Sequence, residues 1–166
     1  LLTLLEPFGF DVQVWSSWMG DDEIRARGAR PVDLACLMST SDVVSVHAAS
    51  TPATAGLVSA DLLALIKPGA TFINTSRGAV VDEAALIREL ATGRFDAVLD
   101  VTCDEVLSPD SPLWDMPNVT LTPHWAGSLG RELHRLGHGA VIDVEACLAL
   151  RPMPGRLDPA LVDVIA

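Results

Sequence analysis

Hydrophobic residues recur along the chain in two patterns, one typical of strands and one typical of helices, and segments with the two patterns alternate. Apolar, valine-rich or alternating runs predict strands at residues 11–15, 42–47, 70–74, 95–101 and 118–121. Between these runs, apolar positions predict helical or apolar-faced segments at residues 1–8, 32–38, 59–66, 83–91 and 131–150. Asp82 is placed to cap the fourth of these segments, and a polar stretch occupies residues 20–30.

Strands that alternate with helices in this way predict an α/β fold with a doubly wound parallel sheet (Rossmann-like). We expect helices to cover both faces of this sheet. Ligands of such sheets bind at the carboxyl ends of the strands. The residues that directly follow the strands are therefore the candidates for a site, namely Ser16, His47, 75–77, Asp100 and 123–127.

The last predicted helix has an apolar stripe, because hydrophobic residues recur on one of its faces. This pattern predicts that the helix packs against another element. The residues that form the stripe are Leu133, Leu136, Val141, Val144 and Leu148.

Composition narrows the class of protein. The chain has 166 residues and a net charge of −11, so binding to nucleic acid or to an anionic membrane surface is not expected. Its apolar runs are too short to span a bilayer, and residues 1–5 do not resemble a secretion signal. The three cysteines share no C-x-x-C spacing, which argues against disulfides or structural zinc. These features favour a cytoplasmic location.

Four segments carry motifs of a known family. They are EPFGFDVQVW from Glu6, SDVVSVHAASTPATAGLVSADLLALIKPGATFINTSRGAVVDEAAL from Ser41, LDVTCDEVLSPDSPLWDMPNV from Leu99 and LTPHWAG from Leu121. Over residues 1–136 the chain resembles the nucleotide-binding domain of the D-isomer-specific 2-hydroxyacid dehydrogenases. The resemblance implies an oxidoreductase that transfers a hydride between a nicotinamide cofactor and a small D-2-hydroxy acid or 2-oxo acid. It also implies a homodimer.

The chemistry of this family requires a cation for the substrate carboxylate and a proton donor for the substrate oxygen. Arg77 matches the family's arginine, whose guanidinium can bind a carboxylate. His124 matches the general acid/base, and Glu105 matches the acid that hydrogen-bonds this histidine. Gly78 is expected to let the backbone turn close to the ligand.

The resemblance also implies residues that bind the cofactor. Asp100 matches the residue that interacts with the nicotinamide side, and backbone around Arg77 and His124 is expected to line the same cleft. The full expected set is Ser16, Ala48, Thr75, Ser76, Arg77, Asp100, His124, Ala126 and Gly127. No metal is expected, since His134 and His138 are four residues apart but have no evident third ligand.

The choice between NAD and NADP stays open at this point, with NAD favoured. Members that use NAD usually have an acidic residue after the strand at 11–15, whereas this chain has Ser16 and Ser17. Serine can bind a ribose hydroxyl but does not repel a 2′-phosphate. Arg25 or Arg27 could reach such a phosphate.

One part of the family pattern is absent, because the sequence contains no G-x-G-x-x-G motif and no central first strand before residues 1–8. These elements form the cradle for the cofactor's pyrophosphate. We therefore expect residues 1–150 to be a dinucleotide-binding domain that is incomplete at its N-terminus. Residues 151–166 are expected to be a tail that returns toward a substrate domain absent from this chain. Either a longer chain or a partner would supply the rest.

Two other functions compete with the dehydrogenase. The first is a non-catalytic dinucleotide-binding regulatory or scaffold protein. The second is an inactive fragment at an oligomer interface. The presence together of Arg77, Glu105 and His124 favours the enzyme, because a binding role does not require all three.

Overall fold

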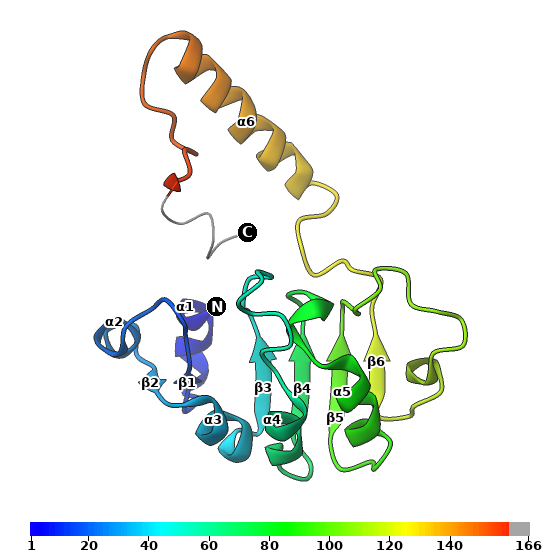
Figure 1. Ribbon diagram of the computed structural model, residues 1–166. Helices are drawn as coiled ribbons and strands as arrows, with labels where there is room; N and C mark the ends of the chain where they lie inside the picture. The colour runs from blue at the N-terminus through cyan, green and yellow to red at the C-terminus, as the bar shows by residue number, and fades with distance from the viewer. Residues whose placement is uncertain (160–166) are drawn as a thin grey trace.

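The computed structural model describes residues 1–159 as a series of strands that alternate with helices (Figure 1). The strands are β1 (Gln13–Val14), β2 (Arg30–Pro31), β3 (Val43–Val46), β4 (Thr71–Asn74), β5 (Asp96–Leu99) and β6 (Val119–Leu121). The α-helices are α1 (Leu2–Leu5), α2 (Asp21–Ala26), α3 (Leu34–Thr40), α4 (Ala60–Leu65), α5 (Glu83–Leu90) and α6 (Glu132–Leu148). Short 3₁₀ helices are η1 (Glu6–Phe8), η2 (Gly78–Val80) and η3 (Pro112–Trp114).

Four strands form one parallel sheet in the order β3-β4-β5-β6, and β1 pairs with β2 in a separate parallel pair. This arrangement confirms the α/β class with a parallel, Rossmann-like sheet. Within residues 1–159, β1 and β3 form no strand pair with each other. This break in the sheet lies where the sequence lacks the expected first strand.

One face of the four-stranded sheet is covered by α3, α4 and α5 (Figure 1). Successive strand residues point to opposite faces, and Val44 and Phe72 of the covered face are buried. On the opposite face Val43 is 56% exposed, and Ile73 and Val98 are only partly buried. The expectation that helices cover both faces is therefore wrong for the described residues, because no described helix packs on this second face as α3, α4 and α5 do on the first.

The connection from β4 to β5 is fixed by side chains at both ends of α5. Asp82 caps the helix as expected, since its Oδ1 accepts a hydrogen bond from the Ala85 amide at 2.9 Å. At the other end, Asn118 Nδ2 donates to the carbonyl oxygens of Leu90 and Phe95 at 3.0 and 2.8 Å. These bonds tie α5 to β5 and β6, whose carboxyl ends carry site residues.

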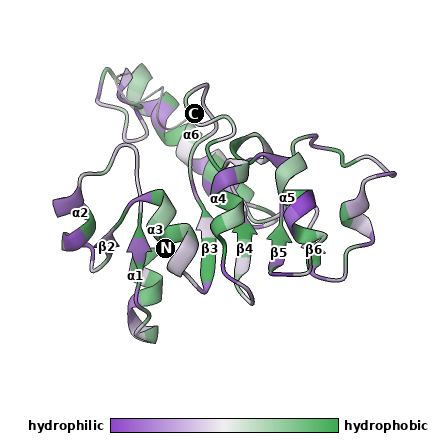
Figure 2. Ribbon diagram, turned by 60° about the horizontal axis from the view of Figure 1, so that its bottom comes forward, coloured by the Kyte–Doolittle hydropathy of each residue, from purple (hydrophilic) through white to green (hydrophobic). Residues whose placement is uncertain are grey.

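Residues 20–30, a polar stretch in the sequence, contain α2 and β2. Figure 2 shows α2 as largely hydrophilic and the strands of the four-stranded sheet as mostly hydrophobic. Ile24 is the buried residue of α2 at 2% exposure. A helix this short, with one buried side chain, has too few apolar positions to show a helical period in the sequence, so the sequence did not predict α2.

Helix α6 extends away from the sheet (Figure 1). Its predicted packing is wrong for the described residues, because the apolar stripe is 54–80% exposed. Ala146 is the only buried residue of α6. The chain that follows α6 turns back toward the helix, where the Gly155 amide donates a hydrogen bond to Asp143 Oδ1 at 2.8 Å. Residues 160–166 of the predicted tail lie outside the described residues. No helix in residues 1–159 is both long and apolar enough to cross a membrane.

Candidate active site

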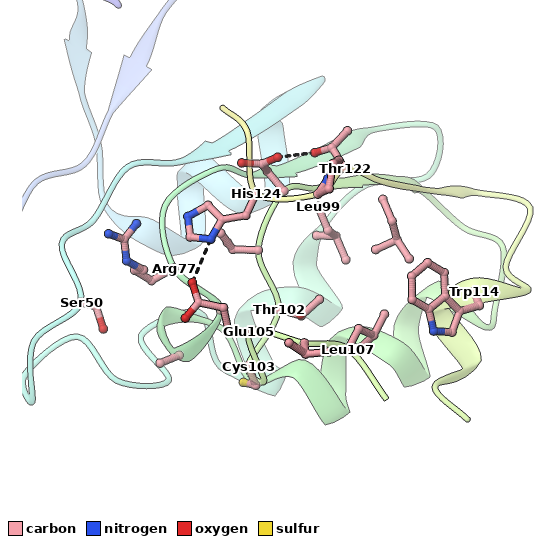
Figure 3. Close-up of a pocket in the computed structure, with 17 residues that line it drawn as sticks. Ser50, Arg77, Leu99, Thr102, Cys103, Glu105, Leu107, Trp114, Thr122 and His124 are labelled. Atoms are coloured by element: carbon pink, nitrogen blue, oxygen red, sulfur yellow. Dashed lines mark hydrogen bonds and ion pairs between the residues drawn. The ribbon is translucent and has the colours of Figure 1, made fainter. Parts of the chain in front are cut away.

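A pocket of about 430 Å³ opens at the carboxyl ends of β4, β5 and β6 (Figure 3). It brings together Arg77, Glu105 and His124, which are far apart in the sequence. Figure 3 shows these three side chains on one side of the pocket, with Trp114 on the other. A cation, a carboxylate and an imidazole thus share one opening.

Arg77 is held by a loop that Asn74 organises. The side chain of Asn74 is buried at the end of β4, where its Nδ2 donates to the Arg77 carbonyl and its Oδ1 accepts from the Ser76 amide, both at 3.0 Å. The Ser76 hydroxyl donates to the Ala48 carbonyl, which joins the loop to the end of β3. Sequence reasoning missed Asn74, although a polar residue at a buried strand position could have indicated it.

Gly78 follows Arg77 and packs against the next loop. A Cβ at this position would lie 2.0 Å from the carbonyl carbon and oxygen of Thr102. Gly78 therefore permits close approach of two backbone segments, and since it also lines the pocket, its expected closeness to a ligand stays a prediction.

His124 and Glu105 form the polar pair of the pocket. Nδ1 of His124 lies 3.1 Å from Oε1 of Glu105, and the two side chains are 41% and 82% exposed (Figure 3). His124 has a left-handed backbone with φ of 52°. A carboxylate at this distance can hydrogen-bond the ring at Nδ1 and orient it. The pair can hold a proton at the mouth of the pocket.

Asp100 lies at the end of β5 and is 3% exposed. Its carboxylate accepts hydrogen bonds from the Thr122 hydroxyl and from the amides of Trp125 and Ala126. Burial alone would raise the pKa of Asp100, but these hydrogen bonds and the nearby His124 outweigh it and lower the pKa below its ordinary value. Asp100 is therefore an anion held within the protein.

The structure places Ser16 in a second pocket, of about 400 Å³, at the ends of β1 and β2. This pocket is also lined by Asp21 and Asp33. Neither Arg25 nor Arg27 lines it. Arg25 pairs with Asp21 and Asp22, and Arg27 pairs with Glu23. The first pocket is not lined by the expected residues Ala48, Thr75, Ser76, Ala126 and Gly127, although each is within three positions of a residue that lines it.

Sequence reasoning did not anticipate part of the first pocket. Ser50, Leu107 and Trp114 line it, and the Trp114 Nε1 donates to the Ser108 carbonyl at 2.9 Å. Cys103 also lines it, but partial burial and then the charge of Glu83 raise the pKa of its thiol. A raised pKa disfavours the thiolate, so Cys103 is a poor nucleophile here.

The residues of both pockets fit a nicotinamide dinucleotide in their chemistry. Hydroxyl and carboxylate groups in the second pocket suit a ribose diol, and the first pocket offers cationic and imidazole groups beside a buried acid. The sequence contains no G-x-G-x-x-G turn for the pyrophosphate. Among residues 1–159, no three His, Cys, Asp or Glu side chains gather as a metal site.

Comparison with known proteins agrees with this geometry. Residues 1–126 match the family model of the D-isomer specific 2-hydroxyacid dehydrogenase, NAD binding domain. The chain is 35% identical over 155 residues to the D-3-phosphoglycerate dehydrogenase of Mycobacterium bovis, covering 93% of this chain and 29% of that protein. It is 37% identical to the glyoxylate/hydroxypyruvate reductase B of Pectobacterium atrosepticum, covering 93% of this chain and 49% of that protein.

A solved structure shows the same arrangement. The D-isomer specific 2-hydroxyacid dehydrogenase of Xanthobacter autotrophicus, in complex with NADPH and MES, superposes with a TM-score of 0.77 at 38% identity. The match covers 96% of this chain and 50% of that one, so the chain spans half or less of the length of these relatives. From the family match, the pocket and the parallel sheet together, the chain belongs to the D-isomer specific 2-hydroxyacid dehydrogenases and corresponds to their NAD-binding domain.

Proposed function

We propose that the protein containing this chain is an NAD(P)-dependent oxidoreductase that interconverts a small D-2-hydroxy acid and the matching 2-oxo acid. The observation that carries the proposal is that Arg77, Glu105 and His124 all line the same pocket. These groups supply a carboxylate-binding cation and a paired proton donor, which this reaction needs. The relatives named above are enzymes of this kind.

In the reducing direction, Arg77 binds the substrate carboxylate and polarises the adjacent carbonyl. When bound, the reduced nicotinamide cofactor supplies the hydride to C2. His124 gives the proton from its ring to the carbonyl oxygen as negative charge develops there, which completes the hydroxyl group. Glu105 holds the ring of His124 through Nδ1 and so keeps it oriented for the transfer.

We assign cofactor binding to the strand ends and the loops that follow them, at Ser16, Ala48, Thr75, Ser76, Arg77, Asp100, His124, Ala126 and Gly127. NAD is favoured over NADP because Asp21 and Asp33 line the pocket that contains Ser16. Two carboxylates can accept hydrogen bonds from ribose hydroxyls and disfavour a 2′-phosphate, Asp21 less strongly because Arg25 lies 3.4 Å from its Oδ2. The arginines expected to bind a phosphate are paired with acids of α2 instead.

The test is reduction of glyoxylate, hydroxypyruvate and related 2-oxo acids by the full-length protein. NADH and NADPH are each offered, and their oxidation is followed by absorbance. We expect turnover with at least one of these acids. Cofactor binding without turnover would favour the alternative of a non-catalytic dinucleotide-binding regulatory or scaffold protein. If the protein neither bound the cofactor nor turned over an acid, both functions would be contradicted.

The domain assignment and the assembly are part of the same proposal. Residues 1–150 form the dinucleotide-binding domain, and residues 151–166 lead toward a substrate domain outside this chain. A homodimer in the cytoplasm is the expected form. Light scattering of the full-length protein tests the dimer, and a monomer at working concentrations would contradict it.

A further inference from the structure

The carboxylate of Asp100 joins the end of β5 to the turn that carries His124. Its Oδ1 accepts hydrogen bonds from the Thr122 hydroxyl at 2.5 Å and from the Trp125 amide at 3.0 Å. Its Oδ2 accepts one from the Ala126 amide at 2.8 Å. These donors flank His124 on both sides in the sequence, so one carboxylate holds the turn at three points.

The backbone of His124 depends on such support. Its φ of 52° lies in the left-handed region, which is unfavourable for a residue with a Cβ. Such a conformation persists only where surrounding contacts determine it. The contacts that support it include an internal bond from the His124 amide to the Thr122 carbonyl and a bond from the Thr122 amide to the Leu99 carbonyl, both at 3.0 Å. The Trp125 and Ala126 amides are held by Asp100. In this conformation Nδ1 of the ring lies 3.1 Å from Glu105.

Asp100 lines the pocket, but its bonding groups are directed at protein donors. It is 3% exposed, and a buried carboxylate is stable when several donors satisfy it. Hydrogen bonds to a charged acceptor are stronger than those between neutral groups. The carboxylate thus has its main partners in the turn rather than in the open part of the pocket.

We propose that Asp100 is a positioning residue, whose carboxylate holds the turn of residues 122–126 so that His124 meets Glu105 and the substrate oxygen together. This inference rests on the proposed function, because Asp100 acts through His124. A positioning role for Asp100 and a contact of Asp100 with the nicotinamide have different kinetic consequences. Loss of alignment lowers kcat, whereas loss of a cofactor contact raises the KM of the cofactor.

The experiment compares Asp100→Ala, Asp100→Asn and Thr122→Val with the wild type in the full-length protein. Asp100→Ala removes the acceptor and should lower kcat about 10- to 10²-fold, with the KM of the oxo acid nearly unchanged. The asparagine keeps one acceptor oxygen, so Asp100→Asn should recover part of the loss. Thr122→Val removes one donor and should have the smallest effect of the three.

Two further measurements separate positioning from a general structural role. The pH profile of kcat/KM should shift in Asp100→Asn, because the His124–Glu105 pair is displaced. The matched control is Asp96→Asn, which removes the same charge from an exposed residue of β5 outside the pocket and should leave rate and profile unchanged. NMR titration of the His124 ring gives a readout that needs no turnover, and it should change in Asp100→Asn and not in Asp96→Asn.

The outcomes distinguish the two proposals. Absence of turnover in the wild type would remove the proposed function, while the His124 titration would still decide whether Asp100 holds the turn. A folded Asp100→Asn variant with the wild-type kcat, pH profile and His124 titration would overturn the positioning role. A raised cofactor KM with unchanged kcat would overturn it as well and assign Asp100 to the cofactor alone. If Asp100→Ala does not fold, Asp100→Asn and Thr122→Val carry the test.

Discussion

Gly78 lies against the peptide backbone of Thr102, and this contact joins the loop of Arg77 to the loop of Glu105. A Cβ at position 78 would lie 2.0 Å from the carbonyl carbon and oxygen of Thr102 and 2.3 Å from the Cys103 nitrogen. Rotation of a side chain cannot relieve a clash with backbone atoms. The spacing between two loops that line the pocket therefore depends on the absence of a side chain at Gly78.

We predict that Gly78→Ala lowers the free energy of unfolding by about 1–3 kcal/mol or more. This range is the usual cost of an added methyl group in a packed region. Urea denaturation gives the free energy of unfolding. The control is Gly137→Ala in α6, where a Cβ meets nothing within 4 Å. Because alanine favours helices, this variant should be as stable as the wild type or more so. Equal stability of Gly78→Ala and the wild type would contradict the packing argument.

His124→Gln should lower kcat about 10²- to 10⁴-fold, because glutamine cannot donate a proton as an imidazolium does. Steady-state kinetics with the best oxo acid measure this effect. His134→Gln makes the same substitution at an exposed position on α6 and should leave kcat unchanged. A His124→Gln variant with near-normal turnover would remove the residue from the mechanism.

Arg77→Ala should raise the KM of the oxo acid and also lower kcat, because the guanidinium binds the carboxylate and polarises the carbonyl. The matched control is Arg88→Ala on α5, which removes an arginine outside the pocket. Unchanged KM and kcat in Arg77→Ala would show that another group binds the carboxylate.

Much of the fold could be predicted because the strands of the central sheet are short, apolar and separated by segments with a helical pattern. Asp82 caps α5 as its position before an apolar periodic run predicted. The order of strand ends also predicted which loops would lie together. Arg77, Glu105 and His124 follow β4, β5 and β6, and parallel strands bring these ends to one edge of the sheet.

The remainder could not be predicted because it depends on packing that local pattern does not record. The apolar stripe of α6 indicated burial, yet Leu136 and Val144 are 59% and 58% exposed. A helical period shows that a face is apolar but does not identify what covers it. Likewise, a polar residue at a buried strand position could have indicated Asn74, but its residue type alone does not specify the two backbone groups that it binds.

Binding of the cofactor should favour NADH over NADPH, with Asp21 contributing to the difference. The carboxylate of Asp21 lines the pocket that contains Ser16 and disfavours a 2′-phosphate. Fluorescence titration should show that Asp21→Asn tightens NADPH binding about two- to fivefold, a small factor because the residue is well exposed. Asp22→Asn is the control, since the carboxylate of Asp22 is next to Asp21 in the sequence but does not line the pocket. Tighter binding of NADPH than of NADH by the wild type would contradict the preference.

Asp100 should make the stability of the protein depend on pH in the acidic range. Its hydrogen bonds lower the pKa in the folded state below the value of about 3.9 that is usual for the unfolded chain. The ionised form is therefore favoured by folding. Its contribution is full above the unfolded pKa and is lost as the pH falls through the folded pKa.

The free energy of unfolding of the wild type should therefore exceed that of Asp100→Asn most clearly near neutral pH. The difference should shrink below about pH 4, where the wild-type carboxyl binds a proton and its charge-assisted bonds weaken. Urea denaturation at a series of pH values measures both proteins, and Asp96→Asn controls for removal of a negative charge from the same strand. A difference that stays constant or grows as the pH falls would mean that the ionised carboxylate does not stabilise the turn around His124.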